Sequence, residues 1–189
     1  MLTFFLLLIA SATDCIPDLP KSMMDNKGNL IEFFVAEDKN GMCVPHGEWI
    51  EEYVTGQVRL KASYLYGRQH GKWTWWFPNG ELEKIGEFKK GKETGHWTFW
   101  DSRGQRLQDG YFCNSIQCGK WTQWWSNGNI RSEVTWQSGK MNGKMTNYFP
   151  NGQKAVEGQV NMDKKHGEWI WWDNKGSIIA KKVLDEISL

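Results

Sequence analysis

Two series of glycines, each repeating every 24 residues without a gap, constrain this chain more than any other feature. The second series lies nine residues after the first, and both run through six consecutive units. Such a register predicts a tandem repeat. We number positions within a unit from the first glycine, which is position 0 and which falls at Gly47, Gly71, Gly95, Gly119, Gly143 and Gly167.

Aromatic residues follow the same period. Position 2 is tryptophan in every unit except the fifth, which has Met145, and position 5 is aromatic in every unit except the first, which has Glu52. Side chains alternate between the faces of a strand, so these two columns are expected on opposite faces. A single-layer sheet has no second layer to form a core, and we therefore predict that most of these rings are structural.

Each unit is predicted to be a β-hairpin. In unit two, residues 73–77 favour a strand, Asn79-Gly80 favours a turn with positive φ at both residues, and residues 81–88 form the return strand. Residues 89–95 then form the turn to unit three. The predicted fold is all-β, an elongated single-layer antiparallel β-meander of tandem 24-residue hairpin repeats.

The N-terminus indicates export. Residues 1–12 form an apolar run that ends in Ala10-Ser11-Ala12, which is typical of a signal peptide and too short for a transmembrane span. A lipoprotein is disfavoured because Asp14 precedes Cys15 where a small residue is required. We therefore expect a secreted or periplasmic protein, with an N-terminal segment and degenerate half-repeat over 13–45, and six repeats with a C-terminal cap over 46–189.

Four cysteines after a signal peptide suggest disulfides. Cys113 and Cys118 flank residues 114–117 and are expected to face each other across one turn, which would allow a bridge. A Cys15–Cys43 bridge would then tie the N-terminal segment to the repeats.

The sequence points away from metal, cofactor, catalytic and nucleic-acid sites. His46, His70 and His166 share position −1, but equivalent positions lie two strands apart, about 9.5 Å, which is too far for shared metal ligation. We interpret them as turn residues. The sequence shows no recognisable arrangement of catalytic residues, so an enzyme is not expected. A net charge of +1 gives no reason to expect a nucleic-acid partner.

Aromatic residues outside the two main columns are the candidate binding face. They occupy positions 4 and 6, and alternation predicts that they share a face with the position-2 tryptophans, where they would widen that face into an aromatic strip. These residues are Trp75, Phe77, Phe99, Trp125, Phe149 and Trp171. Lysines also gather near the turns between units, either as a solvated rim or as a contact for anionic lipid or glycan; they are Lys89, Lys90, Lys92, Lys140, Lys164 and Lys165.

The segments His-Gly-Lys-Trp-Thr-Trp-Trp-Phe-Pro-Asn-Gly at 70–80 and Cys-Gly-Lys-Trp-Thr-Gln-Trp-Trp-Ser-Asn-Gly at 118–128 resemble the MORN repeat variant (MORN-2-like) family, often described as YwqK-type antitoxins. The resemblance covers residues 46 to about 180. It implies an elongated twisted antiparallel sheet that associates with proteins or membrane surfaces and, in bacteria, neutralises a cognate toxin. The signal-like N-terminus departs from a cytoplasmic antitoxin.

The expected function is that of a non-catalytic secreted or periplasmic protein-binding module, with a toxin as one candidate partner and steric occlusion by an aromatic sheet face as the mechanism. A glycan- or choline-type ligand binder is the alternative, because stacked tryptophans suit sugars and quaternary ammonium groups. Association with a membrane surface is the third hypothesis.

Overall fold

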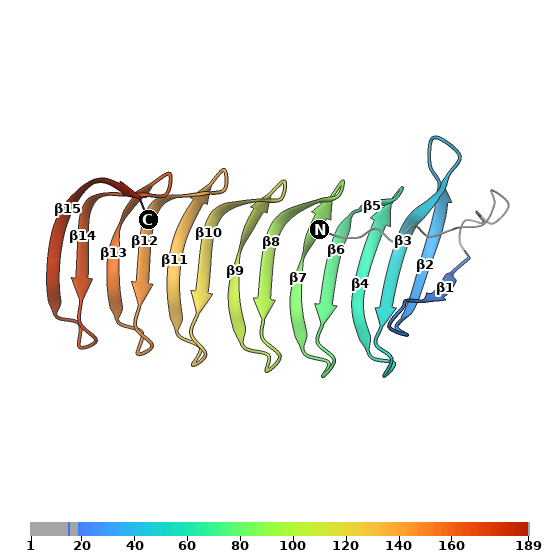
Figure 1. The fold of residues 1–189 in the computed structure, drawn as a ribbon, viewed down its shortest axis with the longest axis horizontal. Coiled ribbons are helices and arrows are strands. Elements are labelled where there is room, and N and C mark those ends of the chain that lie inside the picture. The colour runs from blue at the N-terminus through green and yellow to red at the C-terminus, as the bar shows by residue number, and fades with distance from the viewer. Residues whose placement is uncertain (1–14, 16–18, 189) are drawn as a thin grey trace.

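The computed structural model describes Cys15 and residues 19–188, and its strands form a single 15-stranded antiparallel sheet (Figure 1). Each strand pairs with its neighbours in the chain from β1 to β15, and the short β5 pairs with β4 beside β6. The predicted all-β meander of hairpin repeats is therefore confirmed. The predicted signal peptide lies outside the described residues. In the described part of the chain, no helix has the length and apolar character needed to cross a membrane.

The strands are β1 Lys21–Met24, β2 Leu30–Glu37, β3 Cys43–Glu52, β4 Val58–Leu65, β5 Arg68–Gln69, β6 Gly71–Trp76, β7 Leu82–Lys89, β8 Lys92–Trp100, β9 Arg106–Cys113, β10 Ile116–Trp124, β11 Ile130–Gln137, β12 Lys140–Tyr148, β13 Lys154–Asn161, β14 Lys164–Trp172 and β15 Ile178–Ser188. Two strands form each unit, and β1 and β2 add a hairpin before unit one. All hairpin turns within units lie along one long edge of the sheet, and all turns between units lie along the other (Figure 1).

The turns within units differ from the sequence prediction. Only the glycine of each Asn-Gly pair has positive φ, as at Gly80 (87°), whose N–H donates to the Phe77 carbonyl at 2.9 Å. This is a type I turn followed by a left-handed glycine, a three-residue loop that suits hairpins as well as the predicted two-residue form does. The asparagine serves another purpose. Asn79 Nδ2 donates to the Ser102 carbonyl at 2.6 Å and so links its turn to that of the next unit.

The turns between units are tight two-residue turns and not the longer segment predicted at 89–95. Both central residues have positive φ, as at Lys90 (55°) and Gly91 (82°), which matches the twist of the flanking strands. Two of these turns contain no glycine, because Asn114-Ser115 and Met162-Asp163 adopt the same conformation. The sequences Asn114-Ser115 and Met162-Asp163 carry no strong turn signature, so a two-residue turn was not predicted there.

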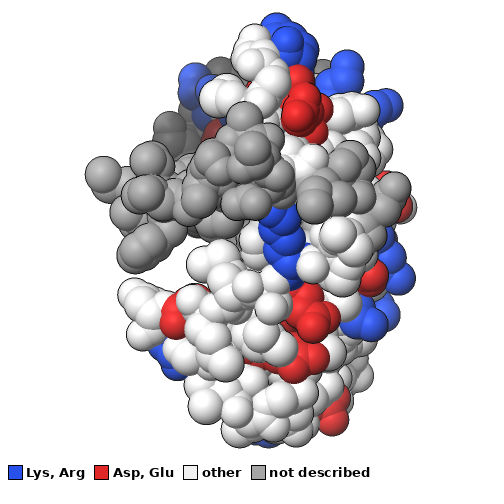
Figure 2. All heavy atoms as spheres, turned by 90° about the vertical axis from the view of Figure 1, so that its right-hand side faces the viewer, with Lys and Arg blue, Asp and Glu red and all other residues white. Residues whose placement is uncertain are grey.

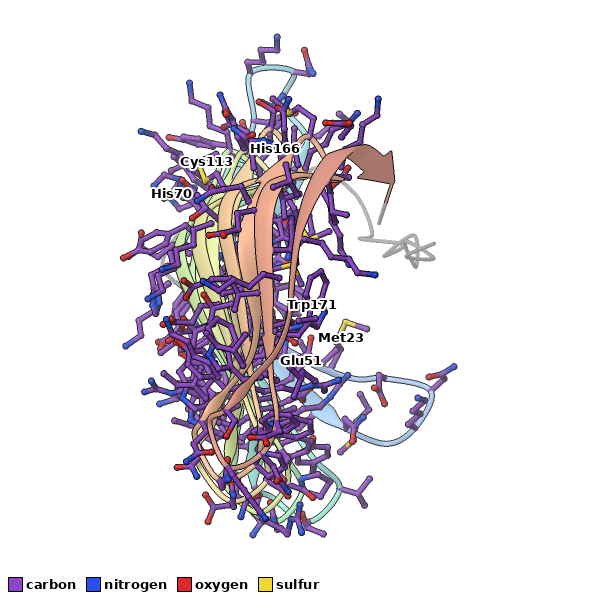
Figure 3. All side chains as sticks on the ribbon, turned by 90° about the vertical axis from the view of Figure 1, so that its left-hand side faces the viewer. Met23, Glu51, His70, Cys113, His166 and Trp171 are labelled. Atoms are coloured by element: carbon purple, nitrogen blue, oxygen red, sulfur yellow. A yellow bond between two sulfur atoms is a disulfide. The ribbon has the colours of Figure 1, made fainter. Side chains whose placement is uncertain are left out.

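The position-0 glycine lies inside a strand, where it forms a β-bulge. At Gly95 (φ 68°) the pairing of β8 with β7 shifts, so that Ile85 pairs with Thr98 but Glu87 pairs with Thr94. Bulges bend strands, and the equivalent shift recurs along the array. We call the side that carries the position-2 tryptophans the inner face. Figure 3 shows Trp171 on the side toward which the upper end of β15 bends.

Three position-2 tryptophans, Trp97, Trp121 and Trp169, pack in the core of the inner face by lying on glycines. A Cβ built on Gly86 would stand 2.1 Å from the Trp97 ring, and one built on Gly110 would stand 2.2 Å from the Trp121 ring. The rings therefore occupy the space that a side chain would need. This contact buries Trp97 to 3% exposure without a second layer of structure.

Unit five shows what happens when the tryptophan is absent. Met145 stands at position 2, and the residue equivalent to Gly86 on the preceding return strand is Val134. The other glycine of this kind, Gly158, again lies under a tryptophan, Trp169, at 2.2 Å from a built Cβ. In units three, four and six the tryptophan lies on a glycine, whereas in unit five the slimmer methionine accompanies a valine, so a smaller side chain at one position goes with a larger one at the other.

The opposite side, the outer face, has a different central column. Position 3 places buried threonines beneath a layer of charged and aromatic side chains, and these are Thr74, Thr98, Thr122 and Thr146. Lys120 and Glu133 form an ion pair above this column at 2.5 Å, and Lys144 and Glu157 repeat it in the next unit at 3.1 Å. The outer face therefore combines paired charges with aromatic side chains, while the core of the inner face consists of rings.

Substitution of Gly86 by alanine is expected to lower the free energy of unfolding by about 2–3 kcal/mol, because the added methyl forces the Trp97 ring from its place. Urea denaturation measures the loss. Val134→Ala serves as the control, since it shortens the side chain in the same column and should cost only about 1 kcal/mol. Equal losses in the two variants would contradict the tryptophan–glycine contact.

Unit five allows a reciprocal test in a double-mutant cycle. Met145→Trp alone should destabilise the protein, because the larger ring meets Val134, whereas Met145→Trp with Val134→Gly should recover most of that loss. The expected coupling is about 1–2 kcal/mol, obtained from urea denaturation of the four proteins. Additive effects would show that the two positions do not share volume.

Candidate binding surfaces

The inner face carries a continuous series of aromatic contacts through units two to four. Phe88 packs against Trp97 with ring centroids 5.3 Å apart, and Phe112 packs against Trp121 at 5.2 Å, both edge to face. Trp97 also contacts Phe112 at 5.8 Å. These geometries are those that aromatic pairs prefer, so each unit is coupled to the next through its rings.

Two of the predicted binding residues extend this series toward solvent. Trp75 lies 5.4 Å from Trp73 and 5.8 Å from Trp97, while Phe99 lies 6.1 Å from Trp97 and 6.4 Å from Trp121. Both are half-buried, unlike the position-2 rings beneath them. Position 4 therefore lies on the inner face, and it adds an accessible margin to the core.

The aromatic margin is interrupted after unit three. Position 4 is Gln123 in unit four and Asn147 in unit five, and it becomes aromatic again only at Trp171. Trp171 packs 6.2 Å from Trp169. The interruption coincides with the loss of tryptophan at Met145, so the exposed aromatic surface consists of one larger patch in units two and three and a smaller one in unit six.

The position-6 residues lie outside the strands. Phe77, Trp125 and Phe149 follow the last residue of their strands and begin the turns within units, where strand alternation no longer fixes the direction of a side chain. Trp125 Nε1 donates to the Tyr148 carbonyl at 3.0 Å, and Tyr53 Oη donates to the equivalent Trp76 carbonyl at 2.8 Å. The predicted candidate face thus divides into position-4 residues beside the core and position-6 residues at the turns.

Several tryptophan rings are covered by cations of the chain itself. Lys84 Nζ lies 4.3 Å from the Trp75 ring centroid, and the Arg106 guanidinium lies 5.0 Å from that of Trp124. Similar contacts join Arg131 to Trp125, Lys154 to Trp172 and Lys165 to Trp169. These pairs were not predicted, although a sequence signal for two of them exists: a cation at position 11 precedes an aromatic residue at position 5 of the next unit at Arg106 and Lys154.

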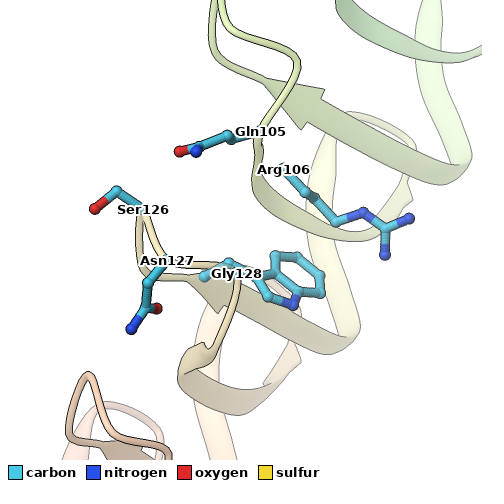
Figure 4. Close-up of a pocket in the computed structure, with 6 residues that line it drawn as sticks. Gln105, Arg106, Ser126, Asn127 and Gly128 are labelled. Carbon is cyan, nitrogen blue, oxygen red and sulfur yellow. The ribbon is translucent and has the colours of Figure 1, made fainter.

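An open groove of 410 Å³ lies beside Trp124, between the turns of units three and four (Figure 4). Its walls include Gln105 and Arg106 on one side and Ser126 and Asn127 on the other. An aromatic ring with amide and hydroxyl groups around it can stack on a sugar and hydrogen-bond to its hydroxyls. The groove is the most polar candidate for a small ligand among the surfaces described.

The structure joins Cys113 to Cys118 and Cys15 to Cys43 by disulfides. The two cysteines were predicted to face each other directly, but the turn contains only two residues, and Cys113 pairs with Ile116 instead. The bridge is diagonal, with Cα atoms 5.9 Å apart. It closes a turn at Asn114-Ser115 that lacks glycine.

The histidines do not lie in turns. His46 and His166 are within β3 and β14, next to the glycine bulges, and the His46 ring packs 4.6 Å from that of Tyr66. Across the part of the chain that the structure describes, there is no group of three or more His, Cys, Asp or Glu side chains that could hold a metal ion.

Charge pairing and burial on the outer face shift the pKa values of Glu133 and Tyr148. The hydrogen bond from Lys120 holds the pKa of Glu133 below its usual 4.5, and burial only partly opposes this effect. Burial, and then the hydrogen bond to Glu133, raises the pKa of Tyr148 to about 12. The Tyr148 hydroxyl donates to Glu133 Oε2 at 3.0 Å, so the pair joins units four and five with Glu133 ionised and Tyr148 neutral at neutral pH.

Fold and surfaces together define a tandem β-hairpin repeat protein with a ring-packed inner face and an outer face that combines charged pairs with aromatic side chains. Three segments of the chain, residues 69–90, 117–138 and 141–161, match the family model of the MORN repeat variant. No curated protein matches the chain. Among solved structures, it is similar to a chain in the crystal structure of the GtfA/B complex bound to UDP and GlcNAc, with 12% identity and a TM-score of 0.26. That match covers 77% of this chain and 25% of the other.

Replacing both Cys113 and Cys118 by serine is expected to lower the free energy of unfolding by about 2 kcal/mol, because the bridge closes a very short loop. The Cys15→Ser/Cys43→Ser variant should lose more, about 3–4 kcal/mol, since its residues are 28 apart in sequence. Urea denaturation of both variants tests the order, and a larger loss at Cys113 and Cys118 would contradict it.

Acidification tests the Glu133 interaction. The folded-state pKa of Glu133 is lowered, so its stabilisation is present above about pH 4.5 and is lost as the pH falls through the folded-state pKa. Glu133→Gln should therefore lose less stability between pH 7 and pH 3 than the parent does, by under about 1 kcal/mol because the ion pair is partly exposed. Glu168→Gln, at an exposed glutamate, is the control, and an equal effect in both variants would argue against the assignment.

Proposed function

We propose that this chain is a non-catalytic binding protein that acts outside the cytoplasm and recognises a protein partner through the inner face of units two and three. The supporting observation is the half-buried margin formed by Trp75 and Phe99 on a fully buried aromatic core. A rigid aromatic margin loses little conformational entropy when it is covered, and exposed aromatic patches commonly mark protein interfaces. The bend of the strands favours a convex partner.

A toxin that this protein neutralises is our leading candidate for the partner. Repeats of the MORN variant type support a role in association, and the resemblance to YwqK-type antitoxins suggests the class of partner. Occlusion requires only that the inner face cover a functional surface of the toxin, and it requires no chemistry from this chain. Two disulfides support an oxidising compartment, which agrees with the signal-like residues 1–12.

A glycan ligand is the second candidate function, and the groove beside Trp124 favours it. A choline-type ligand is less well supported. Its ammonium group would compete with the Lys and Arg side chains that already lie over several tryptophan rings, including Lys84 over Trp75. Tryptophan fluorescence of the parent and of Trp124→Ala during titration with oligosaccharides separates a glycan site from a protein interface.

The protein-binding proposal predicts a difference between two matched double variants. Trp75→Ser/Phe99→Ser should weaken binding to the partner at least 10-fold, because it removes the inner margin. Trp76→Ser/Trp100→Ser changes half-buried aromatics of the same units on the outer face and should bind like the parent. The partner is first isolated from the extracytoplasmic fraction of the source organism with the parent protein, and its affinity for each variant is then measured by calorimetry.

Circular dichroism and thermal unfolding establish that both variants fold. Equal binding by the inner-face variant and the parent would overturn the assignment of the inner face. Growth rescue on co-expression with the isolated partner tests the toxin hypothesis separately.

A further inference from the structure

One row of side chains on the outer face alternates between position 3 of each unit and position 14, the residue opposite it on the return strand. Position 14 is acidic in units three to five. Its carboxylate forms an ion pair with the position-1 lysine in units four and five, and it lies 3.6 Å from His96 at position 1 of unit three. The repeat therefore has a recurrent place for a carboxylate on its outer face, and the residues there are Asp109, Glu133 and Glu157.

Unit five shows which groups hold this carboxylate. Lys144 Nζ lies 3.1 Å from Glu157 Oε2, and the Thr146 hydroxyl donates to the same oxygen at 3.2 Å. A second cation, Lys154, approaches that oxygen to 2.7 Å. The carboxylate is thus bound by two lysines and the hydroxyl of a buried threonine, a donor set that suits an anionic oxygen.

Unit two keeps these donors and lacks the carboxylate. Lys72 and Thr74 stand at positions 1 and 3, but position 14 is Ile85. Lys61, on the preceding strand, pairs directly with Thr74 and supplies a second cation. Within the part of the chain that is described, neither lysine forms an ion pair. Two lysines and a threonine hydroxyl can therefore bind a carboxylate that comes from outside the chain.

An open hollow of 560 Å³ lies at these donors. Its volume is within the range of small-molecule sites, about 300–1,000 Å³. Figure 2 views the molecule from the end of the sheet that holds β1 and shows Lys and Arg side chains along the right-hand margin, the side of the outer face. One wall of the hollow is apolar. We call the hollow the unit-two pocket and define it by Lys61, Lys72, Thr74, Trp76, Leu82 and Ile85.

Two carboxylates of the chain lie near the pocket and do not neutralise Lys72. Glu87 pairs with Lys72 across the strands, but its carboxylate leans toward Gly95, where a built Cβ would stand 3.7 Å from Glu87 Oε2. Glu48 lines the pocket from β3 and forms no ion pair with a residue that the structure describes. The lining therefore carries two cations and one carboxylate, a formal charge of +1.

The apolar wall distinguishes an organic ligand from a simple anion. Trp76 and Leu82 face each other across the strand pair, and both are half-buried beside the donors. In units three and five, a cation at position 11 lies over the position-5 ring of the next unit, as Arg106 does over Trp124. Unit one has Val58 at that position, so its position 11 offers Trp76 an aliphatic neighbour. An inorganic anion would use the lysines alone, whereas an apolar group can also cover this wall.

We propose that the unit-two pocket binds a small organic carboxylate with an apolar body. The carboxylate lies between Lys61 and Lys72 and accepts the Thr74 hydroxyl, as the Glu157 carboxylate does in unit five, while the body packs on the apolar wall. The proposal goes beyond the binding function of the inner face and does not depend on it, because the pocket lies on the opposite face and uses different residues.

Titration of the full chain with hydrocinnamate, an aromatic carboxylate, tests the proposal by NMR. The Thr74 amide and Trp76 indole N–H signals should shift saturably, with a Kd of about 1 mM, as expected for a ligand of this size. Hydrocinnamyl alcohol has the same ring and chain without the carboxylate and should bind at least about 10-fold more weakly. Acetate has the carboxylate without the ring and should also bind at least about 10-fold more weakly.

Ile85→Glu is the decisive variant, because it gives unit two the carboxylate that units four and five already have. It should weaken hydrocinnamate binding at least about 10-fold, whereas Ile85→Gln, which has nearly the same shape as the glutamate variant and no charge, should stay within about threefold of the parent. Lys72→Gln should weaken binding about fivefold to 10-fold. Lys144→Gln, at a lysine that is paired with Glu157, is the matched control and should bind like the parent.

Thermal unfolding establishes that each variant folds. The proposal is overturned if hydrocinnamate causes no saturable shift at Thr74 and Trp76, or if its alcohol binds equally well. Parent-like binding by Ile85→Glu, or equal losses in Lys72→Gln and Lys144→Gln, would also overturn it. These outcomes do not depend on whether the inner face binds a partner.

Discussion

The contact between a tryptophan ring and the glycine of the preceding strand is the interaction on which the rest of this structure depends. A sheet of one layer has no opposing surface against which to bury side chains, so its core must be formed within the layer itself. Gly86 and Gly110 supply the space, and Trp97 and Trp121 fill it. Because each ring lies on a strand of the preceding unit, the same contact that forms the core also joins the units. The array therefore resembles a one-dimensional stack in which stability passes between nearest neighbours.

The glycine bulge complements this contact. It bends each strand at position 0 and brings position 2 over the preceding glycine, as the register shift between β7 and β8 shows. The two faces then separate in character. Rings pack on the inner face, while buried threonines and pairs such as Lys120–Glu133 occupy the outer face. The candidate interface in units two and three follows from this division, since Trp75 and Phe99 add ring surface that the core does not fully use.

The glycine period was sufficient to predict the hairpin, the strand order and the placement of positions 2, 4 and 5. It was not sufficient for the turns. An Asn-Gly pair fits both a two-residue turn and a type I turn followed by glycine, and only backbone angles separate them. The position-0 glycine was predicted to lie in a turn but forms a bulge in a strand, because a glycine of positive φ suits either feature and the sequence does not distinguish them. The expectation for Trp125 has no support from alternation, since β10 ends at Trp124 and alternation does not extend into the turn.

Contacts between side chains on different strands could not be predicted from the sequence either. Lys84 and Trp75 lie on different strands, and their contact depends on a register that the sequence alone does not state. The lysines near the turns between units were visible in the sequence, but the continuous row that these turns form was not, because it depends on the hydrogen bonds between successive turns. Local residue types were thus predictable, whereas properties that depend on the alignment of neighbouring strands were not.

The substitution of tryptophan by Met145 has a consequence for how the molecule responds to load. The aromatic contacts run without interruption through units two to four and resume at Trp169. Unit five is therefore held to its neighbours by fewer ring contacts than the other units are. A chain that is pulled from its two ends separates first where coupling between adjacent modules is weakest. Met145 therefore marks the position at which we expect this array to yield, as two blocks that each keep their own aromatic core.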